Sequence, residues 1–290
     1  MNEHDTLRRF IFDQLSVQGR WVHLDASWRA ALERQDYPEP VRALLGEAMA
    51  ATALMSATLK FDGNLTLQLQ GSGSVHLLVV QCTSGLNLRG LARWHGDIRA
   101  GSFRELIGDG RLVLTIEQTG KAERYQGIVP LEGETLAASL EQYFKRSEQL
   151  DTRLWLSADA SCAAGLLLQV LPDQERNPDA WQHVTVLADT AKAEELTALS
   201  SGELLRRLYH EDDVRLFDAS PVAFRCQCSR NRIEGVLRGL GEDEAQVILR
   251  EQGRVHVECE FCARSYDFDV VDVQALFVPG IQVHTSEARH

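Results

Sequence analysis

The sequence predicts an α+β fold with three parts: an N-terminal domain with a largely antiparallel sheet and helices, a helical linker, and a small C-terminal module. Three observations support this prediction. An early stretch has apolar residues at helical spacing, later stretches alternate with a period of two between turn residues, and the chain becomes charged and thinly apolar after residue 176. We place the domain at 1–176, the linker at 177–225 and the module at 226–290.

The first strong signal is a helix that begins near Pro40, because proline is well tolerated in the first helical turn. The apolar residues that follow recur at helical spacing: Val41, Leu44, Leu45, Ala48, Met49 and Met55. We expect this face of the helix to lie in the core of the domain.

A β-hairpin is predicted next. Leucines alternate from Leu65 to Leu69, the turn sequence Gly71-Ser72-Gly73-Ser74 follows, and an apolar run covers residues 75–80. Gly71-x-Gly73 is also compatible with phosphate binding, but no helix with a following Lys-Ser or Lys-Thr completes such a loop. We therefore interpret the two glycines as part of a hairpin turn.

The remainder of the domain continues this pattern. Asp109-Gly110 precedes a second predicted hairpin with strands at 111–117 and 124–129, and successive hairpins favour an antiparallel sheet. A helix near 135–144 and strand-like segments at 152–157 and 166–171 complete the domain.

The linker begins at Asn177-Pro178, a capping residue followed by a first-turn proline. Ser200 and Glu203 have the spacing of a capping box, and the helix behind them has only a narrow apolar stripe. Such helices depend for stability on what they pack against, so we expect a conditionally stable linker. The alternative is an ordinary helical extension of the main domain.

Composition limits the classes of function. The 290 residues, 44% of them hydrophobic, suffice for one large domain and a small appendage. The formal net charge of −12 disfavours nucleic-acid binding, which relies on clustered Lys and Arg. No apolar stretch approaches the ~18 residues of a membrane span, and the acidic N-terminus does not look like a secretory signal. We expect a cytoplasmic protein that binds neither membrane nor nucleic acid.

Four of the six cysteines lie in two close pairs, Cys226-x-Cys228 and Cys259-x-x-Cys262, with 30 residues between the pairs (259 − 228 − 1). Two such pairs can direct four sulfurs at one ion, and four thiolates in a tetrahedron are a ligand set that zinc prefers. The alternative, four spare thiols grouped by chance, does not explain the local density. Because four protein ligands leave no open coordination position, we expect one structural zinc ion per chain and no enzymatic activity.

The module around these cysteines is predicted to contain two helices, at 232–240 and 242–251, with alternating residues from Val255 to Val270 on either side of the second pair. About 55 residues bury too little apolar surface to fold reliably alone. Structural zinc contributes roughly 10 to 16 kcal/mol in such modules, so removal of the metal should unfold this one.

Other polar residues near the cysteines have weaker interpretations. Arginines close in sequence could keep the sulfurs anionic, or could be plain surface charge: Arg225, Arg230, Arg232 and Arg264. His256 is near enough to replace a ligand, but four thiolates make it unnecessary. Cys82 and Cys162 are expected to be buried small hydrophobes without a functional role.

With these cysteine pairs, the sequence resembles the heat shock protein 33 family, the redox-regulated holdase chaperones of bacteria. The resemblance covers nearly the whole chain and rests on the two cysteine pairs with their long spacer. Three further segments share it: Phe224-Arg225-Cys226-Gln227-Cys228-Ser229-Arg230, Gly127-Ile128-Val129-Pro130-Leu131-Glu132-Gly133, and Tyr143-Phe144-x-x-Ser147-Glu148-Gln149-Leu150.

The resemblance implies a zinc-bound, reduced and inactive monomer. Oxidants would form two disulfides, Cys226–Cys228 and Cys259–Cys262, with loss of zinc and unfolding of module and linker. The oxidised protein would be a homodimer that holds unfolding client proteins without ATP. Alternatives remain a zinc-dependent adaptor or nucleic-acid-binding regulator with a purely structural module, and a disulfide oxidoreductase.

Overall fold

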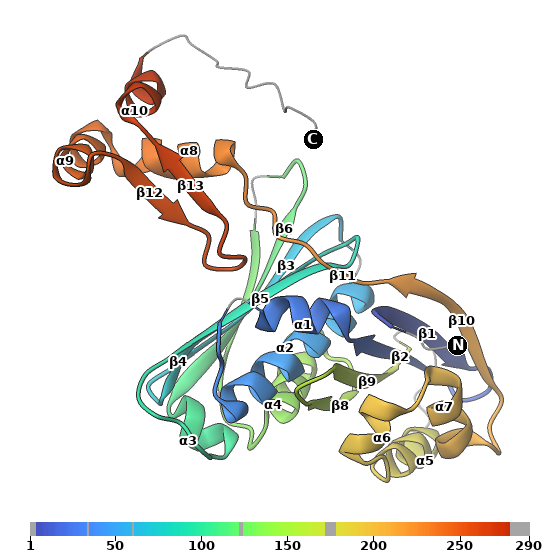
Figure 1. The fold of residues 1–290 in the computed structure, drawn as a ribbon. Coiled ribbons are helices and arrows are strands. Elements are labelled where there is room, and N and C mark those ends of the chain that lie inside the picture. The colour runs from blue at the N-terminus through green and yellow to red at the C-terminus, as the bar shows by residue number, and fades with distance from the viewer. Residues whose placement is uncertain (1–3, 34, 60, 122–123, 172–177, 279–290) are drawn as a thin grey trace. The chain divides into compact units, whose positions relative to one another are not determined.

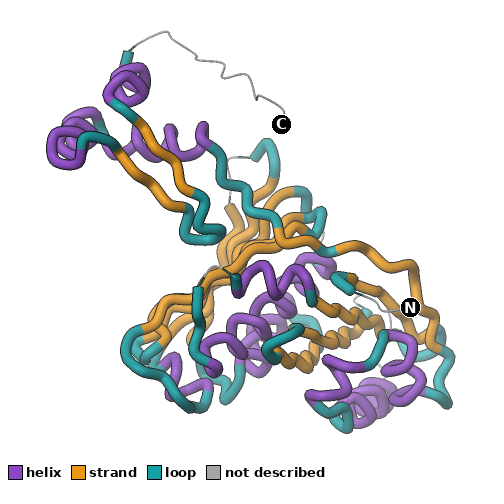
Figure 2. The backbone as a smooth tube through the Cα atoms, in the orientation of Figure 1, coloured by secondary structure: helices purple, strands orange, loops and turns teal. Residues whose placement is uncertain are grey.

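The computed structural model describes residues 4–278 except 34, 60, 122–123 and 172–177. The chain forms two compact units, Met1–Arg225 and Cys226–His290, which are described separately below. Figures 1 and 2 show helices and sheets in both, so the α+β prediction is confirmed.

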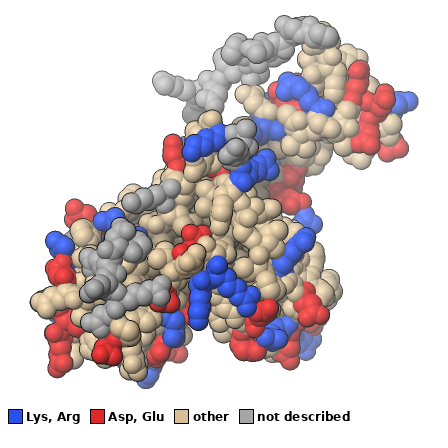
Figure 3. Space-filling view, turned by 180° about the vertical axis from the view of Figure 1, so that it is seen from behind, with Lys and Arg blue, Asp and Glu red and all other residues tan. Residues whose placement is uncertain are grey.

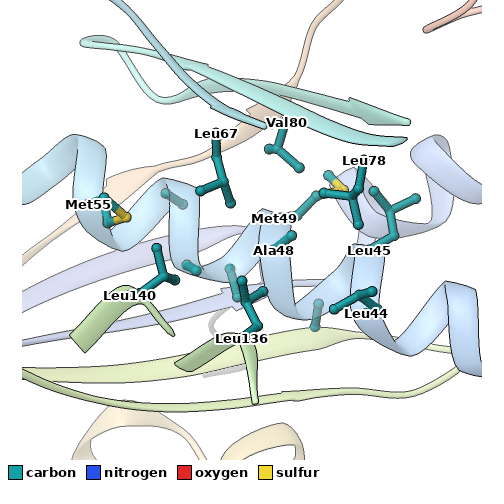
Figure 4. Packing of buried hydrophobic residues seen from close by; sticks show 14 of the residues in the cluster. Leu44, Leu45, Ala48, Met49, Met55, Leu67, Leu78, Val80, Leu136 and Leu140 are labelled. Carbon is teal, nitrogen blue, oxygen red and sulfur yellow. The ribbon is translucent and has the colours of Figure 1, made fainter. Parts of the chain in front are cut away.

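Helix α2 (Glu39–Thr58) forms the centre of the first unit. Its first turn contains Pro40, and its apolar residues are buried, as the spacing predicts. Figure 4 shows Leu67, Leu78 and Val80 above this helix, with Leu136 and Leu140 on its other side. The helix is therefore enclosed by apolar side chains from elements on both sides, which explains why so much of it is apolar.

A six-stranded sheet provides the residues above α2. Both predicted hairpins lie in it and are confirmed, for example by the register that pairs Leu67 with Val80. Gly71 is required in the first hairpin because a Cβ there would lie 2.2 Å from the carbonyl oxygen of Ile107. All pairs are antiparallel except β11 with β5. The strands, in spatial order, are β11 (Ala223–Phe224), β5 (Asn87–Trp94), β4 (Val75–Thr83), β3 (Gly63–Gly71), β6 (Gly110–Gln118) and β7 (Arg124–Pro130).

A second, five-stranded sheet is antiparallel throughout. Its order is β10 (Val214–Pro221), β1 (Thr6–Phe12), β2 (Val17–Leu24), β9 (Ala163–Val170) and β8 (Thr152–Ala158). The two predicted strands β8 and β9 are present. Strand β10 was not predicted: it follows the acidic residues 211–213, lies inside the predicted helical linker and pairs with β1 at the edge of the sheet.

The predicted linker also contains three helices, α5 (Pro178–Ala188), α6 (Ala193–Ala198) and α7 (Ser201–Tyr209). The capping box of α7 is confirmed, since Ser200 Oγ accepts from the Glu203 amide and Glu203 Oε2 accepts from the Ser200 amide. Asn177, the predicted cap of α5, lies outside the described residues. The remaining helices of the first unit are α1 (Ala26–Leu32), α3 (Phe103–Ile107), α4 (Leu136–Tyr143) and a π-helical turn, η1 (Phe144–Glu148).

Two of the segments that carry the family resemblance hold η1 in place. Gly127 lies against the Tyr143 ring, where a Cβ would be 2.6 Å from Cε2. The Tyr143 hydroxyl donates to Glu148 Oε1 at 2.9 Å, and Gln149 has a left-handed conformation with φ of 54°. These residues therefore have a packing function in the first unit.

Glu47 gives this unit a pH dependence. Burial raises its pKa from 4.5 to about 7. Between these values the folded state binds more protons than the unfolded state, so stability falls as pH rises from 4.5 to 7 and is level above. Glu47→Gln should therefore stabilise the unit by about 1 to 3 kcal/mol at pH 8 and have almost no effect near pH 4. Urea unfolding followed by tryptophan fluorescence measures this, since all five tryptophans lie in the first unit; an equal effect at both pH values would contradict it.

The second unit contains α8 (Arg230–Leu240), α9 (Glu242–Gln252), a hairpin of β12 (Val255–Glu258) and β13 (Ser265–Phe268), and α10 (Val270–Phe277). Its core includes Leu237, Leu249 and Phe268. The expectation that Val270 continues the strand pattern is wrong: Val270 begins α10, because Asp269 Oδ1 caps that helix by accepting from the Asp272 amide at 2.9 Å.

Candidate metal centre

Short connections around regular elements position the four cysteines. Cys226 and Cys228 precede α8, whose first turn is capped by Ser229 Oγ accepting from the Arg232 amide. Cys259 and Cys262 lie in the turn that joins β12 to β13, where the Ala263 amide donates to the Cys259 carbonyl at 2.7 Å. The fold of the second unit therefore brings the two pairs together across 30 intervening residues.

The four sulfurs form one cluster. All Sγ atoms lie within 4.8 Å of one another, with Cys226 to Cys259 at 3.6 Å and Cys228 to Cys262 at 3.3 Å. A tetrahedron with metal–sulfur bonds of ~2.3 Å has edges of roughly 3.8 Å, whereas a disulfide bond is only about 2.05 Å long. The arrangement fits a metal ion held by four thiols and contains no disulfide.

The electrostatics of the cluster also fit a bound cation. Burial, together with the neighbouring sulfurs, raises the pKa of Cys259 and raises that of Cys262 to about 12. Four thiolates this close would repel one another in the absence of a positive ion. A divalent cation with a preference for sulfur removes this cost, and zinc is such a cation.

Hydrogen bonds to the sulfurs complete the immediate surroundings. Backbone amides of Phe261 and Cys262 donate toward the Cys259 sulfur, and the Arg264 amide donates toward Cys262. The Tyr266 hydroxyl donates to Cys228 Sγ at 3.2 Å. Tyr266 is the contact residue that sequence reasoning missed, since its alternation in β13 identified a strand position and gave no sign of the sulfur beside it.

The four arginines near the cysteines separate into two groups. Arg264 lies close enough to Cys228 and Cys262 for a direct electrostatic interaction. Arg230 instead pairs with Asp272 at 2.7 Å and stacks over the Phe268 ring, and Arg232 donates to the Gln227 carbonyl. The Arg225 amide donates to the Leu88 carbonyl. Arg264 is therefore the arginine with a described electrostatic contact to the sulfurs.

The remaining candidates lie outside the cluster. His256 Nδ1 is 2.9 Å from Asp267 Oδ1, so its side chain is satisfied by a hydrogen bond. Cys82 and Cys162 are buried, and burial raises their pKa to about 12 and about 11. Thiols with such pKa values are poor nucleophiles at neutral pH.

The surface and the helices of the described residues bear on possible partners. On the face shown in Figure 3, Lys and Arg gather in separate groups with Asp and Glu among them, and no continuous basic surface is visible there on the described residues. None of the helices in the described ranges is long and apolar enough to cross a bilayer.

Comparisons with known proteins show the family to which the chain belongs. A family model described as Hsp33 protein matches residues 5–269. Proteins named 33 kDa chaperonin from Nitrosococcus oceani and Methylobacillus flagellatus are 51% and 45% identical, each over 100% of both chains. The crystal structure of the 33 kDa chaperonin of Thermotoga maritima has the same fold, with a TM-score of 0.83 over 94% of this chain and 98% of that one, at 21% identity.

Proposed function

Because the chain belongs to the Hsp33 family, we propose that it is a chaperone whose four-cysteine centre acts as a redox switch. In this proposal the reduced protein is a cytoplasmic monomer with one zinc ion, and the oxidised protein is a homodimer. The active form binds unfolding client proteins without ATP and prevents their aggregation. It performs no enzymatic reaction and binds neither nucleic acid nor membrane.

The observation that carries the proposal is the sulfur cluster itself. Four residues would hold the zinc ion: Cys226, Cys228, Cys259 and Cys262. A bound zinc ion would cross-link the segment before α8 to the β12–β13 turn, in a unit whose own core is small. Three of the four cysteines are only partly buried, so a small oxidant can reach them. The site therefore combines a stabilising cross-link with ligands that can be oxidised.

Oxidation would proceed in two steps with hydrogen peroxide as the oxidant. One thiolate attacks a peroxide oxygen, which gives a sulfenic acid and water once a proton is taken up. Its partner then attacks the sulfenic sulfur, forms the S–S bond and releases a second water, so two sulfurs lose two electrons to one peroxide. We propose Cys226–Cys228 and Cys259–Cys262 as the pairs, since these sulfurs stay close in sequence after the metal-bound arrangement is lost.

The proposed consequence is release of the linker, 177–225, from the first unit. Helices α5–α7 cover one face of the five-stranded sheet, and both sides of this interface are apolar. The sheet contributes Phe10, Phe12, Val17, Trp21, Ala164, Leu166 and Leu168. Separation of the helices would expose these residues together with the apolar stripes of the helices, which is the kind of surface that unfolded chains bind.

Two atoms in this interface support a marginal stability. Trp21 Nε1 and His23 Nδ1 are buried and have no hydrogen-bond partner among the described residues. Each such buried polar atom costs about 1 to 3 kcal/mol, a cost that water removes when the interface opens. Apolar packing therefore stabilises the interface between sheet and linker, and the two unsatisfied polar atoms destabilise it.

The experiment that tests the proposal compares reduced protein with protein treated with peroxide at mild heat. We expect about one zinc ion per chain before treatment, near-complete zinc release after it, loss of far-UV circular dichroism, and suppression of a client's thermal aggregation only after treatment. Reductant with added zinc should reverse all three changes. Unchanged zinc content with equal activity in both states would contradict the switch, and turnover of dithiol substrates would indicate an oxidoreductase instead.

A further inference from the structure

We propose that Tyr266 controls both the metal affinity and the oxidation rate of Cys228, through the hydrogen bond that its hydroxyl donates to that sulfur. Arg264 acts in the same chain of contacts as a positioning residue for the phenol. This inference rests on the proposed redox function and deepens it, because it names a side chain that sets the sensitivity of the switch.

The geometry of Tyr266 is specific to one cysteine. Tyr266 lies in β13, its ring packs against the core of the second unit, and its hydroxyl is 3.2 Å from Cys228 Sγ. The strand pairing of Val257 with Tyr266 fixes the backbone at this point. The phenol is therefore held against the sulfur by a hairpin and a hydrophobic core, and not by a mobile surface loop.

A second side chain lies near the phenol. Interactions with Tyr266, Cys228 and Cys262 raise the pKa of the Arg264 guanidinium. An arginine at the phenol oxygen polarises its O–H group, which strengthens the bond that the hydroxyl donates to sulfur. The side chains of Arg264, Tyr266 and Cys228 therefore interact in succession.

Cys228 differs from the second pair in the source of its hydrogen bond. Cys259 and Cys262 receive theirs from backbone amides of the turn, which no substitution of a side chain removes. The bond to Cys228 comes from a side chain and disappears in Tyr266→Phe. A substitution of Tyr266 can therefore remove the hydrogen bond to the Cys228 sulfur without changing the backbone hydrogen bonds of the turn that holds Cys259 and Cys262.

The chemistry gives the direction of the effect. A donated hydrogen bond takes up electron density from a thiolate, orients it for the metal, and lowers its nucleophilicity toward peroxide. Loss of a hydrogen bond of this kind typically lowers metal affinity about 10- to 100-fold. The freed thiolate should also react with peroxide about three- to tenfold faster, because only part of the lost interaction appears in the transition state for attack.

The test uses the full-length, zinc-loaded, reduced protein and the variant Y266F. Zinc affinity is measured by competition with a chromophoric chelator, and oxidation of each cysteine by timed alkylation and mass spectrometry. We expect a zinc affinity at least about tenfold weaker, and Cys228 oxidised about three- to tenfold faster relative to Cys262 in the same molecules. The ratio matters because simple loss of zinc exposes all four sulfurs, whereas loss of the hydrogen bond acts on Cys228.

A spectroscopic signature and two further variants complete the design. In the cobalt-loaded protein, the sulfur-to-metal charge-transfer bands should shift in Y266F, since one thiolate has lost its donor. Arg264→Gln should change the zinc affinity and the Cys228-to-Cys262 oxidation ratio in the same direction as Y266F, but by less. Because it keeps the Tyr266 side chain, it also tests the inference if Y266F proves unable to fold. Arg254→Gln is the matched control: Arg254 lies in the same unit and pairs with Asp267 on the surface, so its loss should leave both quantities unchanged.

Wild-type zinc affinity together with a wild-type Cys228-to-Cys262 ratio in both Y266F and R264Q would overturn this inference. The proposed function would survive that result if the unmodified protein still released zinc and gained anti-aggregation activity with peroxide. Failure of the unmodified protein to bind zinc would instead overturn the proposed function, so the two failures are distinguishable.

Discussion

Val184→Glu is expected to make the reduced, zinc-bound protein active without oxidant. Val184 lies on α5, is completely buried, and packs against the five-stranded sheet. An unpaired carboxylate at this position costs on the order of 3 to 5 kcal/mol in the closed state and almost nothing once the helix is in water. The expected result is release of the linker helices while the metal centre stays intact.

Trp21, Trp155 and Trp181 all belong to this interface, so a red shift of tryptophan fluorescence measures its opening. Zinc content should remain at the wild-type value, and client aggregation should be suppressed under reducing conditions. Val186→Glu is the matched control, because Val186 lies on the same helix and is 55% exposed. Activity of both variants, or of neither, would contradict the assignment of this face as the surface that the linker covers.

Cys259→Ser is expected to abolish zinc binding and to unfold the second unit. Cys259 is the most deeply buried cysteine of the cluster, and a serine oxygen is a poor substitute for a thiolate as a zinc ligand. The metal contributes roughly 10 to 16 kcal/mol to such a module, more than the small core of this unit can replace. We expect near-zero zinc content, loss of helical circular dichroism from α8–α10, and fast amide exchange in residues 226–278.

Amide exchange separates this effect from general misfolding, because helix α2 and strands β3–β6 in the core of the first unit should keep their protection. Cys162→Ala is the matched control: it also removes a buried thiol, but one in the first unit, so zinc content should not change. Retention of a full zinc equivalent in Cys259→Ser would show that the cluster is not the metal site.

The predictions from sequence succeeded where a local pattern has one physical interpretation. The spacing after Pro40 requires a helix, and the leucines at 65, 67 and 69 require a strand with one buried face. Each cysteine pair likewise keeps its own two sulfurs close, because only one or two residues separate them, and the fold of the second unit then brings the two pairs together. Val270 shows the limit of such patterns, since a cap at Asp269 changes a strand period into a helix.

What the sequence alone determined about this protein is the group of four cysteines that could hold a metal ion, the helix–sheet alternation of its first domain and the small size of its last. Tertiary structure alone decided that β10 joins β1, that α5–α7 cover the sheet, and that the Tyr266 hydroxyl reaches Cys228. The physical reason is range. Periodicity, caps and cysteine spacing act over a few residues. These three contacts instead join different elements, and Tyr266 is 38 residues from Cys228, through packing and hydrogen bonds that no local pattern records.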